Sequence, residues 1–511
     1  MPALLVQIFA VLFFVLMLVV WFCLSFFNRA SDDIKTGWQL LAAFAVLLIV
    51  AGIGFGYTCI TQNGTIKSVV DVKSSIIVVV LMGVLMLLQI VMVVHIYTPI
   101  GWDVEWTLEA ATTTTTYQRI DYFTACPNNL LLAFYERAWL AVFSFFGLTD
   151  AWLVMSLVGV LSVDMAILTT YATAKRIYNV ETAYSAFFFS VFLFGFTPWL
   201  IVPYSDTFSM PFVMGILYFY TRWSLSVRRP ERAVCAVACG LLTGVGFLLK
   251  PHVAVMAVAF GLIQVLYQKR AEIKGELIFF GLLIAVAFAV YVGFQCFAQY
   301  QELVPILPNR AFPMEHYINT GLSSDPEFGA HGAFGGYSSE NVAAVQNLSS
   351  TQEMRAVSLS MIKERLGRMG FGGYLAFLFN KLRWITSEGY FYWGLESGFA
   401  DFTSREPNVF TQFFYRGGDY LDLYLYVSQG VWVVVLLFVT VAAWLAVTRK
   451  TDRYTFIIEC AVFGLLCFLL IFEGRARYLI SYLPCFSLLA AVGFVQLRQK
   501  YGLLLACKHK E

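Results

Sequence analysis

The sequence predicts an all-α polytopic membrane protein. Of its 511 residues, 59% are hydrophobic and only 13% are charged, too few charges to cover a soluble protein of this length. Apolar runs of roughly twenty residues, the length that a helix needs to cross a bilayer, recur along the chain. The ten cysteines are scattered and form no CxxC pair, so neither a disulfide framework nor a metal cluster is indicated.

Twelve apolar runs are expected to be membrane spans. They cover residues 4–27, 38–60, 76–97, 151–174, 182–201, 207–222, 233–249, 252–268, 276–298, 424–447, 454–472 and 478–497. The first run has no basic region before it and no small-residue cleavage site, so we interpret it as a retained span rather than a signal peptide.

We divide the chain into four parts on this pattern. Residues 1–75 hold two extra N-terminal spans, and residues 76–298 form a membrane module whose first outer loop is 98–150. Residues 299–423 form a large outer loop domain, and residues 424–511 hold the C-terminal spans and a short cytoplasmic tail.

Basic residues gather in six clusters between the expected spans. The clusters are Lys67 and Lys73; Lys175 and Arg176; Arg228, Arg229 and Arg232; Lys269, Arg270 and Lys274; Arg449, Lys450 and Arg453; and Arg498 and Lys500. The positive-inside rule places such clusters in the cytoplasm, and alternating spans satisfy all six. The protein is therefore expected to be a multi-pass protein of the cell membrane. Both of its termini are expected in the cytoplasm, and both of its large loops on the outer face.

Two further apolar stretches are interrupted by charges. Residues 129–146 carry Glu136 and Arg137 near their centre, so we expect an amphipathic helix on the outer membrane surface rather than a span. Residues 371–386 contain Lys381 and Arg383, and we expect a re-entrant or surface helix there, with a helical pair as the alternative.

Polar residues concentrate at the expected outer ends of the spans. They are Asp103, Glu105, Tyr204, Asp206, Lys250, His252, Glu473, Arg475 and Arg477. Carboxylates at membrane edges are costly and are functional candidates for that reason. A polyprenyl-phosphate-linked sugar keeps its lipid in the bilayer and its phosphate at the headgroup level. A carboxylate able to take a proton from an acceptor, with cations able to hold the departing phosphate, would suit that substrate.

Each candidate also has a structural alternative. Asp103 would be a favourable cap for a helix over residues 104–119, and Asp206 for a span beginning at Thr207. Glu105 would favour the dipole of a first helical turn.

The cations have structural alternatives too. Lys250 would reach toward headgroups along its apolar stem. His252 would be an ordinary interface histidine, and Arg475 and Arg477 would pair locally with Glu473.

The order of these motifs resembles the integral-membrane glycosyltransferases of the GT-C superfamily. It is similar to the bacterial protein-mannosyltransferase and aminoarabinose-transferase group. The resemblance covers roughly residues 76–500 and rests on four motifs. They are Asp103 after a span, Pro203-Tyr204-Ser205-Asp206, Lys250-Pro251, and Glu473-Gly474-Arg475-Ala476-Arg477 before the last span.

The resemblance implies a GT-C-type helical bundle with juxtamembrane helices on its outer face. It also implies an outward-facing site that uses a polyprenyl-phosphate-linked sugar, with Asp103 as catalytic base and inversion at the sugar. The acceptor would be an envelope glycan, a glycolipid or a protein. Members often carry two adjacent acids at the Asp103 position. Here Val104 separates Asp103 from Glu105, so only one carboxylate is expected to face the site.

Several alternatives stay open. A divalent cation, Mg²⁺ or Mn²⁺, would be able to bridge Asp103 or Asp206 and a phosphate, although no dedicated metal cage is visible in the sequence. His316 and Trp393 are candidates for the acceptor side or the loop domain. The bilayer is an expected partner and nucleic acid is not.

The main rival function is a transporter or flippase of lipid-linked sugars. Transporters place charges near the bilayer midplane and often contain inverted repeats. Here most charges lie at span ends and no repeat is visible, but Asp164 and Glu459 lie inside expected spans.

Overall fold

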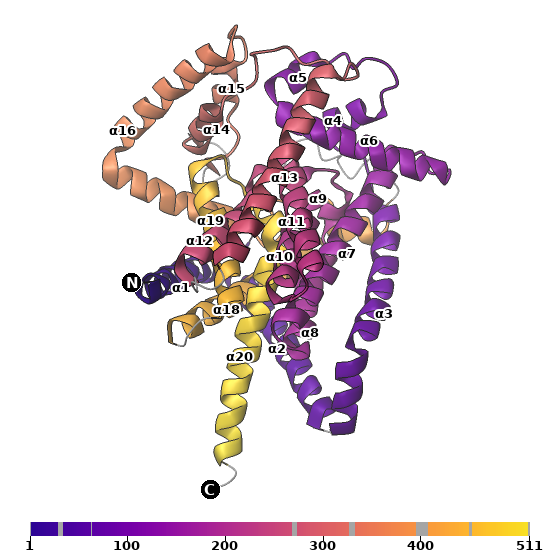
Figure 1. Ribbon diagram of the computed structural model, residues 1–511, viewed down its shortest axis with the longest axis vertical. Helices are drawn as coiled ribbons and strands as arrows, with labels where there is room; N and C mark the ends of the chain where they lie inside the picture. Colours follow the sequence, from indigo (N-terminus) through magenta and orange to yellow (C-terminus); the bar gives the residue numbers. More distant parts are fainter. Residues whose placement is uncertain are drawn as a thin grey trace.

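The computed structural model describes residues 2–28, 34–62, 64–267, 273–325, 333–394, 407–448 and 452–508. The basic residues Lys269, Arg270, Arg449 and Lys450 lie outside these ranges. Within them the chain is almost entirely helical, and the predicted all-α polytopic class is confirmed (Figure 1).

Nine helical segments in the described ranges are long and apolar enough to cross a membrane. They are formed by α1 (Pro2–Phe26), α2 (Thr36–Gln62), α3 (Gly64–Ile96), α7 (Ala151–Ile177), α11 (Arg229–Leu249), α13 (Ile273–Tyr300), α18 (Leu421–Thr448), α19 (Arg453–Ile471), and the 3₁₀ segment η6 (Ala476–Tyr482) with α20 (Leu483–Lys508).

The other three expected spans are helical but shorter over the residues described, so nine of the twelve expected spans are confirmed as long enough to cross a membrane. One is α8 (Val180–Ser190), which continues as the π-helical turn η2 (Val191–Gly195). The others are α10 (Met210–Leu225) and α12 (Val255–Tyr267). Pro198 and Pro251 begin separate 3₁₀ turns, η3 (Pro198–Ile201) and η4 (Pro251–Ala254), because proline cannot continue a helix through its missing N–H.

The two extra N-terminal helices are part of the bundle. Both α1 and α2 pack against α18, which in turn packs against α20. Gly430 of α18 allows a close contact between α18 and α2, since a Cβ at this position would lie 2.7 Å from the backbone carbonyl carbon of Ala42. The N-terminal spans therefore support the C-terminal ones.

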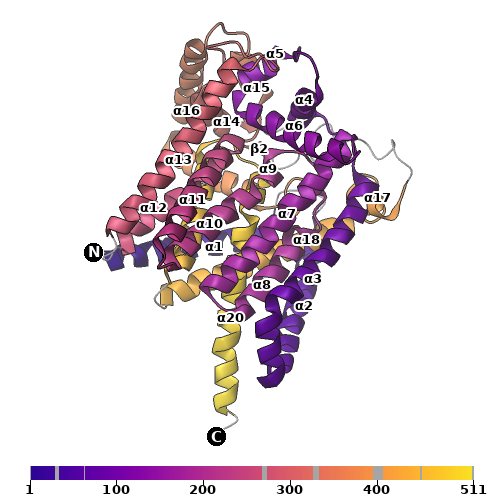
Figure 2. The same cartoon turned by 45° about the vertical axis from the view of Figure 1, so that its right-hand side comes forward.

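Six short elements and the long bent helix α16 collect at the end of the molecule opposite the C-terminus (Figure 1). They are α4 (Trp102–Thr112), α5 (Ile120–Ala125), η1 (Pro127–Asn129), α6 (Leu130–Phe145), α14 (Met314–Gly321), α15 (Ser339–Val345) and α16 (Thr351–Thr386). Two-residue strands, β1 (Ser324–Asp325) and β2 (Ala333–Phe334), pair antiparallel with Ser324 opposite Phe334. The short helix α17 (Val409–Phe414) lies against α3 and α18 (Figure 2).

Helix α6 corresponds to the stretch expected to lie on the membrane surface. It has 16 residues and crosses the ends of the long helices α3 and α7 instead of running beside them (Figures 1 and 2). Glu136 is buried against α4, where Thr107 donates a hydrogen bond to it over 3.3 Å. Arg137 donates to the carbonyls of Ala111 and Thr113. The charges within this apolar stretch thus attach α6 to α4.

Helix α16 contains the second charged apolar stretch. It bends at Gly370, whose φ of 61° is left-handed, and the arm over residues 371–386 returns to the bundle. Lys381 on this arm is buried and donates to the carbonyls of Gly321, Leu470 and Phe472 at 2.7, 3.1 and 2.6 Å. Burial lowers the pKa of Lys381 to about 7. The arm is therefore inserted into the protein, and Lys381 holds the end of α19.

Candidate functional site

Asp103 and Tyr204 bring two outer segments together. The Tyr204 hydroxyl donates a hydrogen bond of 2.9 Å to Asp103 Oδ2. Burial, with the nearby Asp103 charge, raises the pKa of Tyr204 well above its ordinary value, so the hydroxyl keeps its proton. Asp103 is half-buried.

Helix α4 begins one residue before Asp103, so Asp103 is not its cap. The N-cap is Gly101, which makes no side-chain capping bond. The helix also ends at Thr112, short of the expected boundary at residue 119, because Thr113 is extended and a run of β-branched threonines follows. The capping alternative for Asp103 is therefore wrong.

Trp102, at the first position of α4, has a left-handed φ of 54°, which is rare for a bulky residue. Its ring meets that of Tyr204 edge-on at 5.1 Å and lies 4.8 Å from the Arg477 guanidinium. Strained backbone of this kind persists only where surrounding contacts hold it. These contacts hold the residue that precedes Asp103 against Tyr204 and Arg477.

Asp206 is the centre of a buried ion cluster. Its Oδ1 pairs with Lys250 Nζ, and its Oδ2 pairs with Arg477 Nη1 at 3.1 Å. All three side chains are buried. One carboxylate faces two cations, so the three side chains carry a net positive charge when all are ionised.

Asp206 does not cap a helix either. It is the second residue of α9 (Ser205–Phe208), whose N-cap, Tyr204, makes no side-chain capping bond. Lys250 follows the end of α11, and Arg477 lies in η6. The cluster therefore joins three segments that are distant in sequence.

Aromatic rings cover the two cations. The centroid of the Tyr204 ring is 5.9 Å from Lys250 Nζ and 5.3 Å from the Arg477 guanidinium carbon. Tyr478 lies 4.5 and 5.1 Å from the same two groups, and its hydroxyl donates to Glu473 at 2.8 Å. Burial lowers the pKa of Lys250 to about 8, with Asp206 opposing the shift.

Arg475 lies beside this cluster on the same turn. It is buried, and its guanidinium carbon is 5.4 Å from the centroid of the Tyr392 ring. The backbone N–H of Glu473 donates to the carbonyl of Tyr317, which ties the turn to α14. The motif from Glu473 to Arg477 thus contributes to the site at both ends: Glu473 accepts a hydrogen bond from Tyr478, and Arg477 pairs with Asp206.

A polar wall that the sequence analysis missed lies next to Asp103. The side-chain amide of Asn129 donates to the Tyr122 hydroxyl at 2.5 Å and to the Tyr204 hydroxyl at 3.5 Å. Burial, and then the charge of Asp103, raise the pKa of Cys126 to about 12. In the sequence, the feature that could have indicated this wall is the polar segment of residues 127–129, which comes directly before the apolar stretch at 130–145.

Comparison with known proteins gives the family. The sequence matches, over residues 1–496, the model of a family described as conserved hypothetical integral membrane protein. The chain belongs to this family. No curated protein matches the sequence significantly.

Three solved structures, of two proteins, are similar to this chain at low sequence identity. Archaeal oligosaccharyltransferase AglB from Archaeoglobus fulgidus, in complex with an inhibitory peptide and a dolichol-phosphate, is 11% identical, with a TM-score of 0.37 over 84% of this chain and 52% of that one. This chain therefore spans about half the length of AglB. ArnT from Cupriavidus metallidurans is 14% identical in two states, with coverage of 82% of this chain and 78% of ArnT. The TM-scores are 0.36 for the apo state and 0.37 with undecaprenyl phosphate bound.

Some predicted site residues of this integral membrane protein lie elsewhere. Glu105 is exposed in the first turn of α4, in agreement with only one acid facing the site. His252 is buried, contacts Ser481 Oγ through Nε2 at 2.6 Å, and packs near Phe468 and Tyr482. Its place is in the packing between η4 and η6.

The two candidates from the loop domain are also buried. His316 packs against Phe312 with ring centroids 4.4 Å apart, and burial lowers its pKa to about 4. Trp393 donates to the carbonyl of Phe414 and packs against Trp199, with 3% of its surface exposed. A ring so fully covered offers no face to a sugar, so its expected acceptor role is not supported.

The residues at Asp206 do not fit a divalent cation. Both carboxylate oxygens already pair with Lys250 or Arg477, and these cations would repel a metal ion. No group of three or more His, Cys, Asp or Glu side chains in the described ranges has metal-binding geometry. Asp206 therefore has no oxygen left for a metal ion.

Proposed function

We propose that the protein is a GT-C-type glycosyltransferase that transfers a sugar from a polyprenyl-phosphate-linked donor to an acceptor on the outer face of the membrane. One observation carries the proposal. Tyr204 bonds Asp103 through its hydroxyl and lies beside Lys250 and Arg477 through its ring. A carboxylate and two buried cations thus meet at the end of the bundle.

The two halves of this site have different charge environments. Asp103 is half-buried and bonds to a neutral hydroxyl, so its carboxylate is suited to accept a proton. Asp206 pairs with a cation through each of its two oxygens, so neither oxygen is open to an acceptor hydroxyl, and its role is to position Lys250 and Arg477. The net positive charge of the cluster favours a phosphate beside it.

The reaction follows from this arrangement. Asp103 removes the proton of the acceptor hydroxyl, and the acceptor oxygen forms a bond to C1 of the sugar. The bond from C1 to the phosphate oxygen breaks through an oxocarbenium-like transition state, and the phosphate keeps the electron pair. Lys250, Arg475 and Arg477 stabilise the charge that develops on it. Attack opposite the leaving phosphate inverts the configuration at C1.

A transfer assay tests the function. Membranes containing the protein are supplied with radiolabelled undecaprenyl-phosphate hexoses and pentoses, and the label in envelope polymers, glycolipids and proteins is measured. We expect one of these donors to lose its sugar to an acceptor, at a rate that depends on the protein. No donor consumption above that of membranes lacking the protein would contradict the proposal.

A flippase for lipid-linked sugars is the second candidate. Asp164 of α7 and Glu459 of α19 are buried inside the bundle, and each has an oxygen without a hydrogen-bond partner among the residues described. Ionisable groups inside a membrane bundle often mark transport paths. The same assay separates the two functions, because a flippase leaves its lipid-linked sugar chemically intact.

The outer location of the site is tested by cysteine labelling. Thr115 and Arg229 are both exposed, and they lie at opposite ends of the proposed topology. In a variant without native cysteines, Thr115→Cys should react with an impermeant thiol reagent added outside intact cells, and Arg229→Cys only after lysis. Labelling of Arg229→Cys in intact cells would place the site in the cytoplasm instead.

A further inference from the structure

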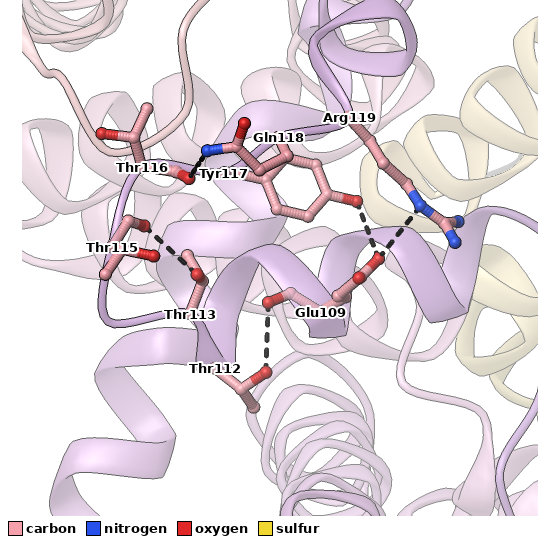
Figure 3. A pocket seen from close by; sticks show the side chains of 8 residues that line it. All are labelled: Glu109, Thr112, Thr113, Thr115, Thr116, Tyr117, Gln118 and Arg119. Atoms are coloured by element: carbon pink, nitrogen blue, oxygen red, sulfur yellow. Dashed lines mark hydrogen bonds and ion pairs between the residues drawn. The ribbon is translucent and has the colours of Figure 1, made fainter.

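A pocket opens at the far end of α4 from Asp103 (Figure 3). Its volume is about 310 Å³, near the lower end of the roughly 300–1,000 Å³ typical of ligand pockets. It is lined by Glu109, Thr112, Thr113, Thr115, Thr116, Tyr117, Gln118 and Arg119. Neither the proposed chemistry nor the lipid phosphate uses these residues.

The charges of the pocket balance each other. Glu109 Oε2 accepts a hydrogen bond from the Tyr117 hydroxyl at 3.1 Å and lies 3.6 Å from Arg119 Nε (Figure 3). A phosphate would therefore meet a carboxylate as well as a guanidinium. With polar side chains almost throughout, the lining also gives an acyl chain little to pack against.

The wall of the pocket is held in place, while two of its hydroxyls are open. The Thr113 hydroxyl donates to the Thr115 carbonyl, and the Gln118 side-chain amide donates to the Thr116 carbonyl (Figure 3). The hydroxyls of Thr115 and Thr116 are exposed and have no hydrogen-bond partner within the described part of the chain. These groups are able both to donate and to accept, as sugar hydroxyls require.

Helix α4 connects the pocket to the proposed base. Glu105, Glu109 and Thr112 are spaced i, i+4 and i+7, so they share one face of the helix, and all three are exposed. At 1.5 Å per residue, Glu109 lies about 9 Å along the helix axis from Asp103. Six positions also turn the helix by about 240°, so Glu109 and Asp103 lie on different sides of α4. A glycan bound in the pocket therefore reaches the carboxylate by extending around the helix.

We propose that this pocket binds a neutral carbohydrate segment of the acceptor, which makes the acceptor a glycan. The proposal rests on the proposed function for its link to transfer. The pocket holds hydroxyl, amide, carboxylate and guanidinium groups of balanced charge, which suit a polyhydroxylated neutral ligand. A glycan that extends from the pocket around α4 would present a hydroxyl of the same chain to Asp103.

Direct binding is the first test. Envelope polysaccharide from the same cells is shortened by partial acid hydrolysis, labelled with a fluorophore and titrated against the purified full-length protein in detergent. The double variant Thr115→Val/Thr116→Val keeps side-chain shape but removes two hydroxyls, and should weaken binding roughly five- to thirtyfold. Thr114→Val is the matched control, since Thr114 is an exposed neighbour outside the pocket lining. Equal affinities of the double variant and the wild type, or no binding to either, would overturn the proposal.

Transfer measurements separate this proposal from the proposed function. With the same oligosaccharides as acceptor, the double variant should raise the KM for acceptor and leave hydrolysis of the donor by water unchanged. If donor hydrolysis fell equally, the threonines would act on the catalytic site and the pocket role would be contradicted. Oligosaccharide binding that depends on Thr115 and Thr116, in a wild-type protein that consumes no donor, would retain the pocket and reject the glycosyltransferase.

Discussion

Asp103→Asn is expected to lower sugar transfer by roughly 10²–10⁴-fold, the usual contribution of a general base. Asparagine has almost the same shape and can still accept the hydrogen bond from Tyr204, so the site should stay assembled. It cannot take the acceptor's proton at neutral pH. The measurement is sugar transfer from the polyprenyl-phosphate donor in membranes that carry equal amounts of each variant.

Glu105→Gln is the control for this experiment. Glu105 lies two positions further along α4 and is exposed, so its loss should change transfer only slightly. Because neither side chain caps the helix, a difference between the two variants cannot come from capping. Near-normal transfer by Asp103→Asn would remove Asp103 from the mechanism.

Asp206→Asn is expected to destabilise the protein by about 3–5 kcal/mol, the cost of removing one partner from a buried ion pair. Asp206 is fully buried, and its loss would leave Lys250 and Arg477 close together without a counter-charge. The variant should unfold at a lower temperature in detergent and accumulate less in the membrane. Asp422→Asn, at an exposed position in the first turn of α18, should change stability by less than about 0.5 kcal/mol.

A double variant shows whether the loss of stability in Asp206→Asn comes from the uncompensated charges. Asp206→Asn combined with Lys250→Met removes one of the two uncompensated cations and should recover part of the lost stability. Residues in direct contact typically show coupling of 0.5–3 kcal/mol in such a cycle. Strictly additive effects of the two substitutions would show that the ion cluster does not hold α9 to the end of α11.

Much of the membrane architecture was visible in hydropathy alone. Helices occur at all twelve apolar runs, and the stretch with Glu136 and Arg137 near its centre forms the short helix α6, which crosses the ends of the long helices. These features depend on local properties: the length of an apolar run and the positions of charges within it. The same local signal did not show that Pro198 and Pro251 begin separate 3₁₀ turns within two of the apolar runs or at their ends.

The composition of the candidate site was also visible in part. Asp103, Tyr204, Asp206, Lys250 and Arg477 stood out because polar groups at span ends are rare in so apolar a chain. Their pairing was not visible. Lys250 and Arg477 were candidates for a phosphate, without Asp206 as their shared partner, and His252 and Trp393 were candidates for ligand binding, whereas the structure packs both of the latter into the core.

The sequence by itself therefore determined the fold class, the helical segments and the acidic and basic residues at the ends of the bundle. Only the tertiary structure decided which of them act together. Asp206 meets Lys250 across 44 positions and Arg477 across 271, and Tyr204 reaches Asp103 across 101. Hydropathy and capping preferences are properties of neighbouring residues, but the charge state and role of a buried carboxylate depend on which distant side chains the fold places beside it.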